Sequence, residues 1–391
     1  MKTSTLPTRD SKLLKTLAYY AALIMLGTVT ASSGPALPSL AARTHSALDT
    51  ISIIFTTGAL GYLLGSLLGG WLYDRLPGHS LMAGWLVGMA ALLALIPTIS
   101  QLWVLSGTML LVGLMQGALD VGANTLIVWV HRRQVEPFMN GLHFVFGIGA
   151  LLTPLLIGQS LARYDNIDWA YRLLAVAMLP VALFLWRLPS PQAPSNQEEE
   201  TSNGVNYPLV ALISSFLLLY VGVEAGFSGW IYTYATAFQV GDMAAAAYLN
   251  SAFWAALTVG RLLSIPIATR LSPGTVLSGD LLGGMISMSV VLLWPHSHLA
   301  LWAGTLGLGL TIASIFPTAL SFAGRRMKIT GGITAWFFVG ASAGGMLVPW
   351  LIGQRFASLG PQSTMVVIFV DLLLATGVYA LVYWYAKRGE R

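Results

Sequence analysis

The chain contains no cysteine. Disulfide bonds, thiolate metal sites and thiol nucleophiles are therefore excluded. Its six histidines are scattered and form no helical pair of the kind that binds zinc. It also lacks the Gly-x-x-x-x-Gly-Lys-Ser/Thr loop that holds nucleotide phosphates. Because no nucleophile is spaced with a base or a metal cluster, we expect neither an enzyme nor a cofactor.

Charged residues are scarce as well. They make up 9% of the 391 residues, whereas a soluble domain carries about 25%. Hydrophobic residues make up 56%, so the lipid bilayer is the expected surrounding. The net charge of +5 includes no basic run longer than Arg325-Arg326-Met327-Lys328. That run is too short for a nucleic-acid-binding segment, and no nucleic-acid partner is expected.

Apolar runs follow one another along the whole chain. Each is long enough, as a helix, to cross a hydrocarbon core of about 30 Å. We predict an all-α membrane protein with twelve transmembrane helices near residues 13–38, 48–73, 79–99, 101–130, 137–161, 169–187, 208–238, 244–269, 274–294, 298–324, 330–357 and 361–386.

The same pattern occurs twice, with the second copy displaced by 195 residues. Repeated residues include Ser33-Gly34 with Ser228-Gly229, Gly65 with Gly260, Arg75 with Arg270, Gly149 with Gly344, Pro154 with Pro349, and Gly158-Gln159 with Gly353-Gln354. A parallel repeat in an apolar chain predicts two pseudo-symmetric six-helix bundles, which can rock about a site at their interface. We place the bundles at residues 1–188 and 207–391, within a single chain that we expect to be monomeric.

The distribution of basic residues predicts the orientation. Of the 20 Lys and Arg residues, all but Arg43, Arg163, Arg172, Arg355 and the mid-helix Arg261 fall on one side of a twelve-crossing chain. Basic residues near helix ends are retained in the cytoplasm. We therefore expect a multi-pass protein of the cytoplasmic (inner) membrane with both termini in the cytoplasm. Residues 189–206, rich in Pro, Ser, Asn and Glu, form a predicted cytoplasmic linker.

Four segments resemble a known family. GGWLYDRLPGH, from Gly69 to His79, is similar to the loop signature of the major facilitator superfamily. GLMQGALDVGAN, NGLHFVFGIGALLTPLL and YVGVEAGFSGWIYTYA resemble its sugar-permease branch, which holds the fucose permeases and the sodium-dependent glucose transporter-like proteins. The resemblance implies the major facilitator fold. It also implies that Asp74 and Arg75 belong to a gating charge network; alternatively, they form a charged turn that only fixes topology.

Helix 101–130 carries Asp120 near its midpoint. Gly113, Gly117, Asp120 and Asn124 share one face, so two close-packing glycines are followed by two polar groups. A charged Asp at this depth costs about 2.5–3.5 kcal/mol on the insertion scale, which favours a watered cavity or a partner over lipid. Asp120 is thus predicted to bind the coupling ion or the substrate, or else to make a structural hydrogen bond.

Glu224 is the corresponding feature of helix 208–238. Tyr220 lies one turn before it and Ser228 one turn after it. A carboxyl group at mid-membrane depth either takes a proton or binds Na⁺ together with neighbouring oxygens. The resemblance to sodium-dependent proteins favours Na⁺, at Glu224 and Asp120, whereas the fucose permeases favour H⁺. Both possibilities stay open.

A sugar requires amide or carboxyl groups for its hydroxyls and an aromatic ring for its apolar face. Candidates for these roles are Gln116, Asn124, Asn140, His143 and Asn250, with Trp230 and Trp254 as rings. Mid-helix tryptophans can also serve only for packing. Arg261 is expected either to pair with a carboxylate or to reach the lipid headgroups.

These features together predict a secondary active transporter that carries a sugar or sugar-like molecule with Na⁺ or H⁺ by alternating access. The alternative within this class is a proton-coupled exporter of hydrophobic, drug-like or lipid-like compounds, which the many aromatic and Met residues would suit. A receptor without transport is disfavoured because the linker contains no signalling domain.

Overall fold

A computed structural model describes residues 9–191, 206–239, 243–327 and 331–389. The predicted linker, 189–206, lies mostly outside the described residues. Those that are described form helices and turns, and no strand occurs among them. Twelve spans in this part of the chain are long and apolar enough to cross a membrane. The predicted all-α fold with twelve spanning helices is confirmed.

The first six crossings form the N-lobe. Its helices are α1 (Arg9–Thr30), α2 (Ser33–Arg43), α3 (Leu48–Ile51), α4 (Ile53–Tyr73), α5 (Gly78–Leu95), η1 (Ile96–Thr98), α6 (Leu102–His131), η2 (Arg132–Gln134), α7 (Glu136–Tyr164) and α8 (Asp168–Arg187).

The last six crossings form the C-lobe. Its helices are α9 (Tyr207–Ala237), α10 (Met243–Ala268), α11 (Pro273–Leu293), α12 (His298–Ile312), α13 (Ile315–Gly324), α14 (Gly331–Leu359) and α15 (Ser363–Gly389).

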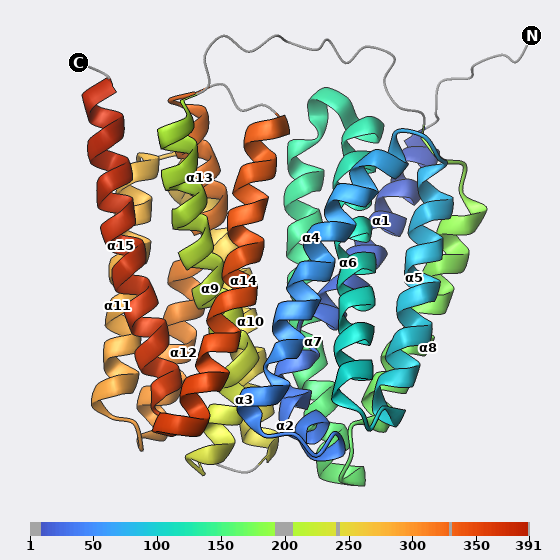
Figure 1. Ribbon diagram of the computed structural model, residues 1–391. Coiled ribbons are helices and arrows are strands. Elements are labelled where there is room, and N and C mark those ends of the chain that lie inside the picture. Colours follow the sequence, from blue (N-terminus) through green and yellow to red (C-terminus); the bar gives the residue numbers. More distant parts are fainter. Residues whose placement is uncertain (1–8, 192–205, 240–242, 328–330, 390–391) are drawn as a thin grey trace, which may run out of the picture.

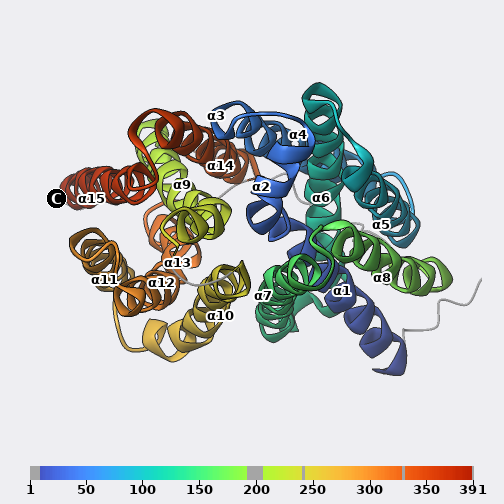
Figure 2. The same ribbon diagram turned by 90° about the horizontal axis from the view of Figure 1, so that it is seen from below.

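The two lobes stand side by side, as the view along the helix axes shows (Figure 2). Helix α7 contacts α10, helix α14 contacts α3 and α4, and α2 contacts α9. Helices α8 and α15 end, and α1 and α9 begin, at the same end of the molecule, at the top of Figure 1. We call this end the linker face and the opposite end the far face.

Three spans are interrupted, which the sequence did not predict. Predicted helix 48–73 is divided at Ser52 into α3 and α4, and two further spans are broken next to a proline. Predicted helix 13–38 is broken after Thr30 and continues as α2 to Arg43; helix 298–324 is broken between α12 and α13. Proline explains these two breaks. Pro35 and Pro317 lie four residues after Ala31 and Ala313, and neither can donate the backbone hydrogen bond that would continue the helix. The break after Thr30 lies beside the cavity described below.

Glycine allows the helices of each lobe to approach closely. A Cβ added to Gly113 or Gly117 of α6 would collide with the backbone of α4, at Gly58 and Tyr62 respectively. The predicted close packing along this face of α6 is therefore confirmed. The same close packing occurs at two equivalent glycines of the repeat, because Gly149 lies against α1 and Gly344 lies against α9.

The lobes are joined by hydrogen bonds toward the far face. Gln159 Nε2 of α7 donates to the hydroxyl of Tyr248 in α10 at 3.2 Å. Gln354 Nε2 of α14 donates to the carbonyl oxygen of Asp49 in α3 at 2.9 Å. The two glutamines are equivalent in the 195-residue repeat, so the same residue type joins the lobes twice. These two hydrogen bonds join the lobes on the far side of the molecule.

Candidate substrate cavity

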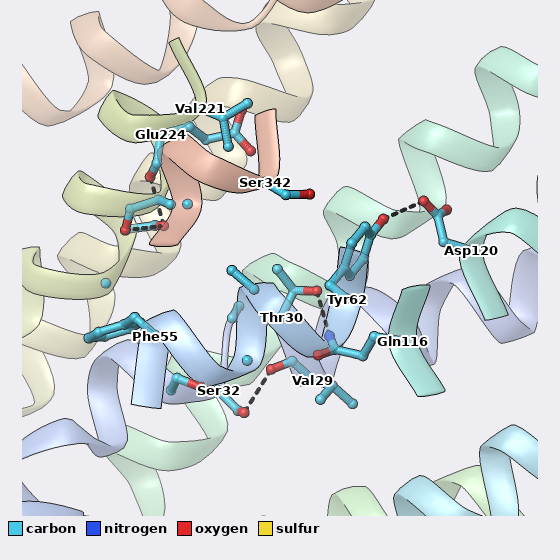
Figure 3. Close-up of a pocket in the computed structure, with 18 of the residues that line it drawn as sticks. Val29, Thr30, Ser32, Phe55, Tyr62, Gln116, Asp120, Val221, Glu224 and Ser342 are labelled. Carbon is cyan, nitrogen blue, oxygen red and sulfur yellow. Dashed lines mark hydrogen bonds between the residues drawn. The ribbon is translucent and has the colours of Figure 1, made fainter. Parts of the chain in front are cut away.

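A cavity of about 550 Å³ lies between the lobes. The N-lobe contributes the broken end of α1 with α2, α4, α6 and α7, and the C-lobe contributes α9, α10, α13 and α14. Figure 3 shows side chains from both lobes directed toward this space. Polar and aromatic side chains mix on its wall, as ligand sites generally require.

Asp120 is the N-lobe carboxylate of the cavity. The hydroxyl of Tyr62 in α4 donates to Asp120 Oδ2 at 2.5 Å (Figure 3). Asn124, one turn later in α6, donates from Nδ2 to Asp120 Oδ1 at 2.9 Å. Both carboxylate oxygens therefore already accept a hydrogen bond from the protein. This arrangement fixes the carboxylate on the cavity wall, where Asp120 and Asn124 both lie.

Gln116 lies one turn before Asp120 on the same wall. Its Nε2 donates to Thr30 Oγ1 at 3.0 Å, at the point where α1 is interrupted (Figure 3). The break in α1 thus brings a hydroxyl within reach of α6. The amide and the hydroxyl together offer hydrogen-bonding groups to a polar ligand.

Glu224 is the C-lobe carboxylate. The hydroxyl of Tyr220, one turn earlier in α9, donates to Glu224 Oε2 at 2.5 Å. Among the described residues, no side chain or backbone group donates to Oε1. Ser228, one turn later, donates to the backbone oxygen of Glu224 at 2.8 Å. Glu224 therefore keeps one carboxylate oxygen available, in contrast to Asp120.

A second cavity, also of about 550 Å³, lies toward the linker face. Asn140 near the start of α7 and Arg261 near the end of α10 line it. His143 and Glu224 line both cavities, so these two side chains mark the boundary between them. A solute in the central cavity would meet them before it could move toward the linker face.

Trp254 of α10 is the predicted ring that lies on the cavity wall. Phe146 of the N-lobe stacks edge-on against it, with ring centroids 6.2 Å apart. Its indole Nε1 is buried and has no hydrogen-bond partner among the described residues. The ring can therefore offer an apolar face to a ligand, whereas its N–H is buried away from the cavity.

Trp230 and Asn250 line neither cavity. Both are fully buried. Trp230 Nε1 donates to the carbonyl oxygen of Pro349 at 2.9 Å, and Asn250 Nδ2 donates to the carbonyl oxygen of Ser228 at 2.8 Å. Their hydrogen bonds serve the packing of the C-lobe, so the structure does not bring these two predicted residues to the cavity.

Asp74 and Arg75 lie exposed on the linker face, away from both cavities. Arg75 donates from Nη1 to the backbone oxygen of Trp71 at 2.9 Å, and its guanidinium lies 4.3 Å from the centroid of the Trp71 ring. Neither residue takes part in an ion pair between described residues. Their gating role stays a prediction.

No metal cluster is evident. Within the described ranges, no three His, Asp or Glu side chains come together. A Na⁺ ion at Glu224 or Asp120 would therefore need hydroxyl, amide or carbonyl oxygens as its remaining ligands.

Sequence reasoning missed Tyr62, Thr30, Phe55 and Phe146, all of which line the central cavity. Tyr62 had a signal in the sequence. It lies four residues after Gly58, on a helix whose glycines follow one another at the spacing of a close helix contact. A polar side chain in that row is directed toward the neighbouring helix.

Twelve spanning helices, arranged as two lobes around a cavity, define the class of multi-pass membrane transporters. Residues 19–349 match the family model of the Major Facilitator Superfamily, and the chain belongs to that superfamily.

The chain is also similar to curated relatives. Sodium-dependent glucose transporter 1A of Mus musculus is 31% identical over 372 residues, which cover 85% of this chain and 88% of the relative. Major facilitator superfamily domain-containing protein 4A of Homo sapiens is 27% identical over 474 residues, which cover 95% and 92%. The predicted resemblance to the sodium-dependent glucose transporter-like proteins is confirmed.

Solved structures share the fold. A variant of the nucleoside transporter NupG superposes with a TM-score of 0.77 at 13% identity, over 95% of this chain and 100% of that chain. A bacterial homolog of the human lysosomal transporter Spinster, in an inward-facing and unoccupied conformation, gives a TM-score of 0.72 at 14% identity, over 95% and 96%. At these identities the likeness concerns the fold alone.

Proposed function

We propose that this transporter carries a sugar or sugar-like molecule together with a cation, Na⁺ or H⁺. The observation that carries the proposal is the pair of carboxylates on one cavity. Asp120 comes from the N-lobe and Glu224 from the C-lobe, and each accepts a hydrogen bond from a tyrosine hydroxyl. A cation held there would act on both lobes and so favour one arrangement of them over another.

The composition of the cavity wall supports a sugar. Gln116, Asn124 and His143 offer amide and imidazole groups, and Trp254 offers an aromatic ring. Hydroxyl-rich ligands require such directional partners, because each unmatched buried polar group costs about 1–3 kcal/mol. The names of the similar glucose transporters point to the same substrate class.

Glu224 is assigned the main ion-coupling role. Its Oε1 accepts no hydrogen bond from the described residues, whereas both oxygens of Asp120 are occupied. An oxygen without a donor is the better cation ligand or proton acceptor, because nothing has to be displaced. Asp120 then serves as a substrate contact or as a further cation ligand.

The proposed orientation places the linker face in the cytoplasm, following the excess of basic residues on that side. The hydrogen bonds that join the lobes at Gln159 and Gln354 then close the outer side. The linker-side cavity leads from Glu224 toward the cytoplasm. The described conformation corresponds to an inward-facing state in a cycle of alternating access.

Uptake into liposomes that contain the purified full chain tests the proposal. With labelled glucose and an imposed Na⁺ or H⁺ gradient, the parent should concentrate the sugar. Glu224→Gln keeps size and hydrogen bonding but loses the ionisable charge, so accumulation should be abolished while exchange of sugar across the membrane survives. Glu136→Gln, at an exposed glutamate on the linker face, serves as the matched control. Undiminished accumulation by Glu224→Gln would assign the coupling site elsewhere.

A further inference from the structure

Arg261 has an unusual position for a basic residue in a membrane protein. It lies on α10, seven residues before Ala268, where the helix ends at the linker face. At 1.5 Å per residue, this is about 10 Å inside the helix end. Its side chain lines the linker-side cavity and is half-buried. The positive-inside rule explains why basic residues lie at the cytoplasmic ends of helices. It does not explain a basic residue this deep inside a helix.

Arg261 has no fixed ionic partner. Among the described residues, the ion pairs are Arg43–Asp168 at 2.8 Å and Arg172–Asp168 at 4.0 Å, and neither involves the cavity. The charged or titratable groups that line the cavity with Arg261 are His143, Glu224, Arg325 and the hydroxyl of Tyr220. Glu224 is the one carboxylate among the lining residues. The guanidinium and this carboxylate therefore face the same space without being paired.

Tyr220 connects the two charges. Its hydroxyl donates to Glu224 Oε2 at 2.5 Å, and it lies near enough to Arg261 for the guanidinium charge to act on it. The charge of Arg261 also acts on His143, which lines both cavities with Glu224. Glu224 is thus bordered by the substrate cavity on one side and by Arg261 on the side of the linker face.

We propose that Arg261 is an internal counter-ion that competes with the coupling cation for Glu224 and so promotes release of the cation toward the linker face. This rests on the proposed cation coupling at Glu224. When the cation leaves, the guanidinium neutralises the carboxylate, so no unpaired charge remains in the cavity. When a cation occupies Glu224, the attraction between this carboxylate and Arg261 is lost, so occupancy is weakened while the cavity faces the cytoplasm.

The size of the effect follows from Coulomb's law. Opposite unit charges that line the same cavity, in an effective dielectric near 20, interact strongly enough to change an affinity roughly tenfold. Arg261→Gln should therefore bind the cation about tenfold more tightly than the parent and should release it more slowly. Arg261→Lys keeps the charge and should stay close to the parent.

Direct cation binding provides a test that does not depend on the substrate. Radioactive Na⁺ is bound to the purified full chain in detergent, and proton uptake is followed with a pH-sensitive dye in weakly buffered solution. Arg270→Gln removes an exposed guanidinium, just after the linker-face end of α10, that lines neither cavity, and is the matched control with unchanged affinity expected. Thermal unfolding of each variant reports whether the fold is retained.

The outcomes separate the two proposals. A parent that responds to neither Na⁺ nor pH would overturn cation coupling itself, and the role of Arg261 with it. A parent that binds the cation, together with a folded Arg261→Gln variant whose affinity is unchanged or weaker, would overturn the counter-ion role alone. The result expected is tighter binding in Arg261→Gln, parental binding in Arg261→Lys and parental binding in Arg270→Gln.

Discussion

Gly34 and Gly229 lie against each other where the two lobes meet. A Cβ added to Gly34 would lie 3.2 Å from Gly229 Cα and 2.5 Å from the carbonyl oxygen of Ser228. The two glycines are equivalent in the 195-residue repeat. A residue that contacts its own repeat equivalent must lie close to the pseudo-twofold axis between the lobes. The axis therefore passes between α2 and α9, beside the central cavity.

Gly34→Ala should separate the lobes at this contact. Overpacking costs about 1–3 kcal/mol, which would change the ratio of the two conformations roughly five- to hundredfold away from the described one. Because the chain has no native cysteine, Ser342→Cys on the cavity wall provides a single reporter. Labelling by a membrane-impermeant maleimide from the far side should increase.

Gly84→Ala is the control for Gly34→Ala. Gly84 lies on α5, and a Cβ there would meet nothing within 4 Å. Labelling should stay at the parental level in this variant. Equal labelling of the parent and of Gly34→Ala would show that the Gly34–Gly229 contact does not limit the conformational change.

Two further glycines extend the same symmetry to the far face. A Cβ on Gly158 would meet Cβ of Ala247 at 2.5 Å, and a Cβ on Gly353 would collide with Ser52. Ala247 and Ser52 are themselves 195 residues apart. Gly158→Leu and Gly353→Leu should therefore each open the far face and increase maleimide labelling of Ser342→Cys. Gly377→Leu, on an open surface of α15, is the control. Increased labelling in only one of Gly158→Leu and Gly353→Leu would contradict a closure that is symmetric between the lobes.

Much of the fold was predictable because apolar length and internal repetition are properties of the sequence. Twelve spans, two lobes and the close-packing face with Gly113 and Gly117 follow from spacing alone. The breaks near Pro35 and Pro317 were not predicted. Proline is tolerated within many membrane helices, so its presence does not tell where a helix will be interrupted.

The site was predictable only in part. Asp120, Glu224 and Trp254 line the cavity, since a polar or large residue at mid-depth on a cavity-forming helix tends to avoid lipid. Trp230 does not line the cavity. Because α9 is buried on nearly all sides, the spacing of its apolar residues does not distinguish the cavity face from the lobe interior. Whether a side chain on α9 faces the cavity is decided by tertiary contacts, such as the hydrogen bond from Trp230 to Pro349.

Trp254 and Trp230 should respond differently to the same substitution. Trp254→Phe reduces the aromatic face on the cavity wall and should weaken sugar binding by about 0.5–1.5 kcal/mol, or roughly two- to tenfold. Trp230→Phe breaks the hydrogen bond to Pro349 and should lower the unfolding temperature with little effect on affinity. Competition with labelled glucose and thermal unfolding measure the two quantities. If only Trp230→Phe lost affinity for sugar, Trp230 and not Trp254 would be the ring that contacts the sugar.

Asp371 is a carboxyl group on a membrane-spanning helix that lies outside the cavity, in contrast to Glu224. It lies on α15, is 5% exposed, and its Oδ2 has no hydrogen-bond partner among the described residues. This atom is directed at Gly222 of α9, where an added Cβ would lie 2.7 Å from it. A buried charge with neither counter-ion nor donor is costly, so the ionised form contributes nothing to stability.

Asp371→Asn should therefore retain gradient-driven accumulation of sugar and keep or slightly raise the unfolding temperature, whereas Glu224→Gln loses accumulation. The two substitutions each convert a membrane carboxyl into an amide, and they differ in whether the group faces the cavity. Transport in liposomes with an imposed ion gradient measures the difference. If Asp371→Asn uncouples transport as completely as Glu224→Gln, facing the cavity is not what selects the coupling residue, and the C-lobe must carry the ion through its interior.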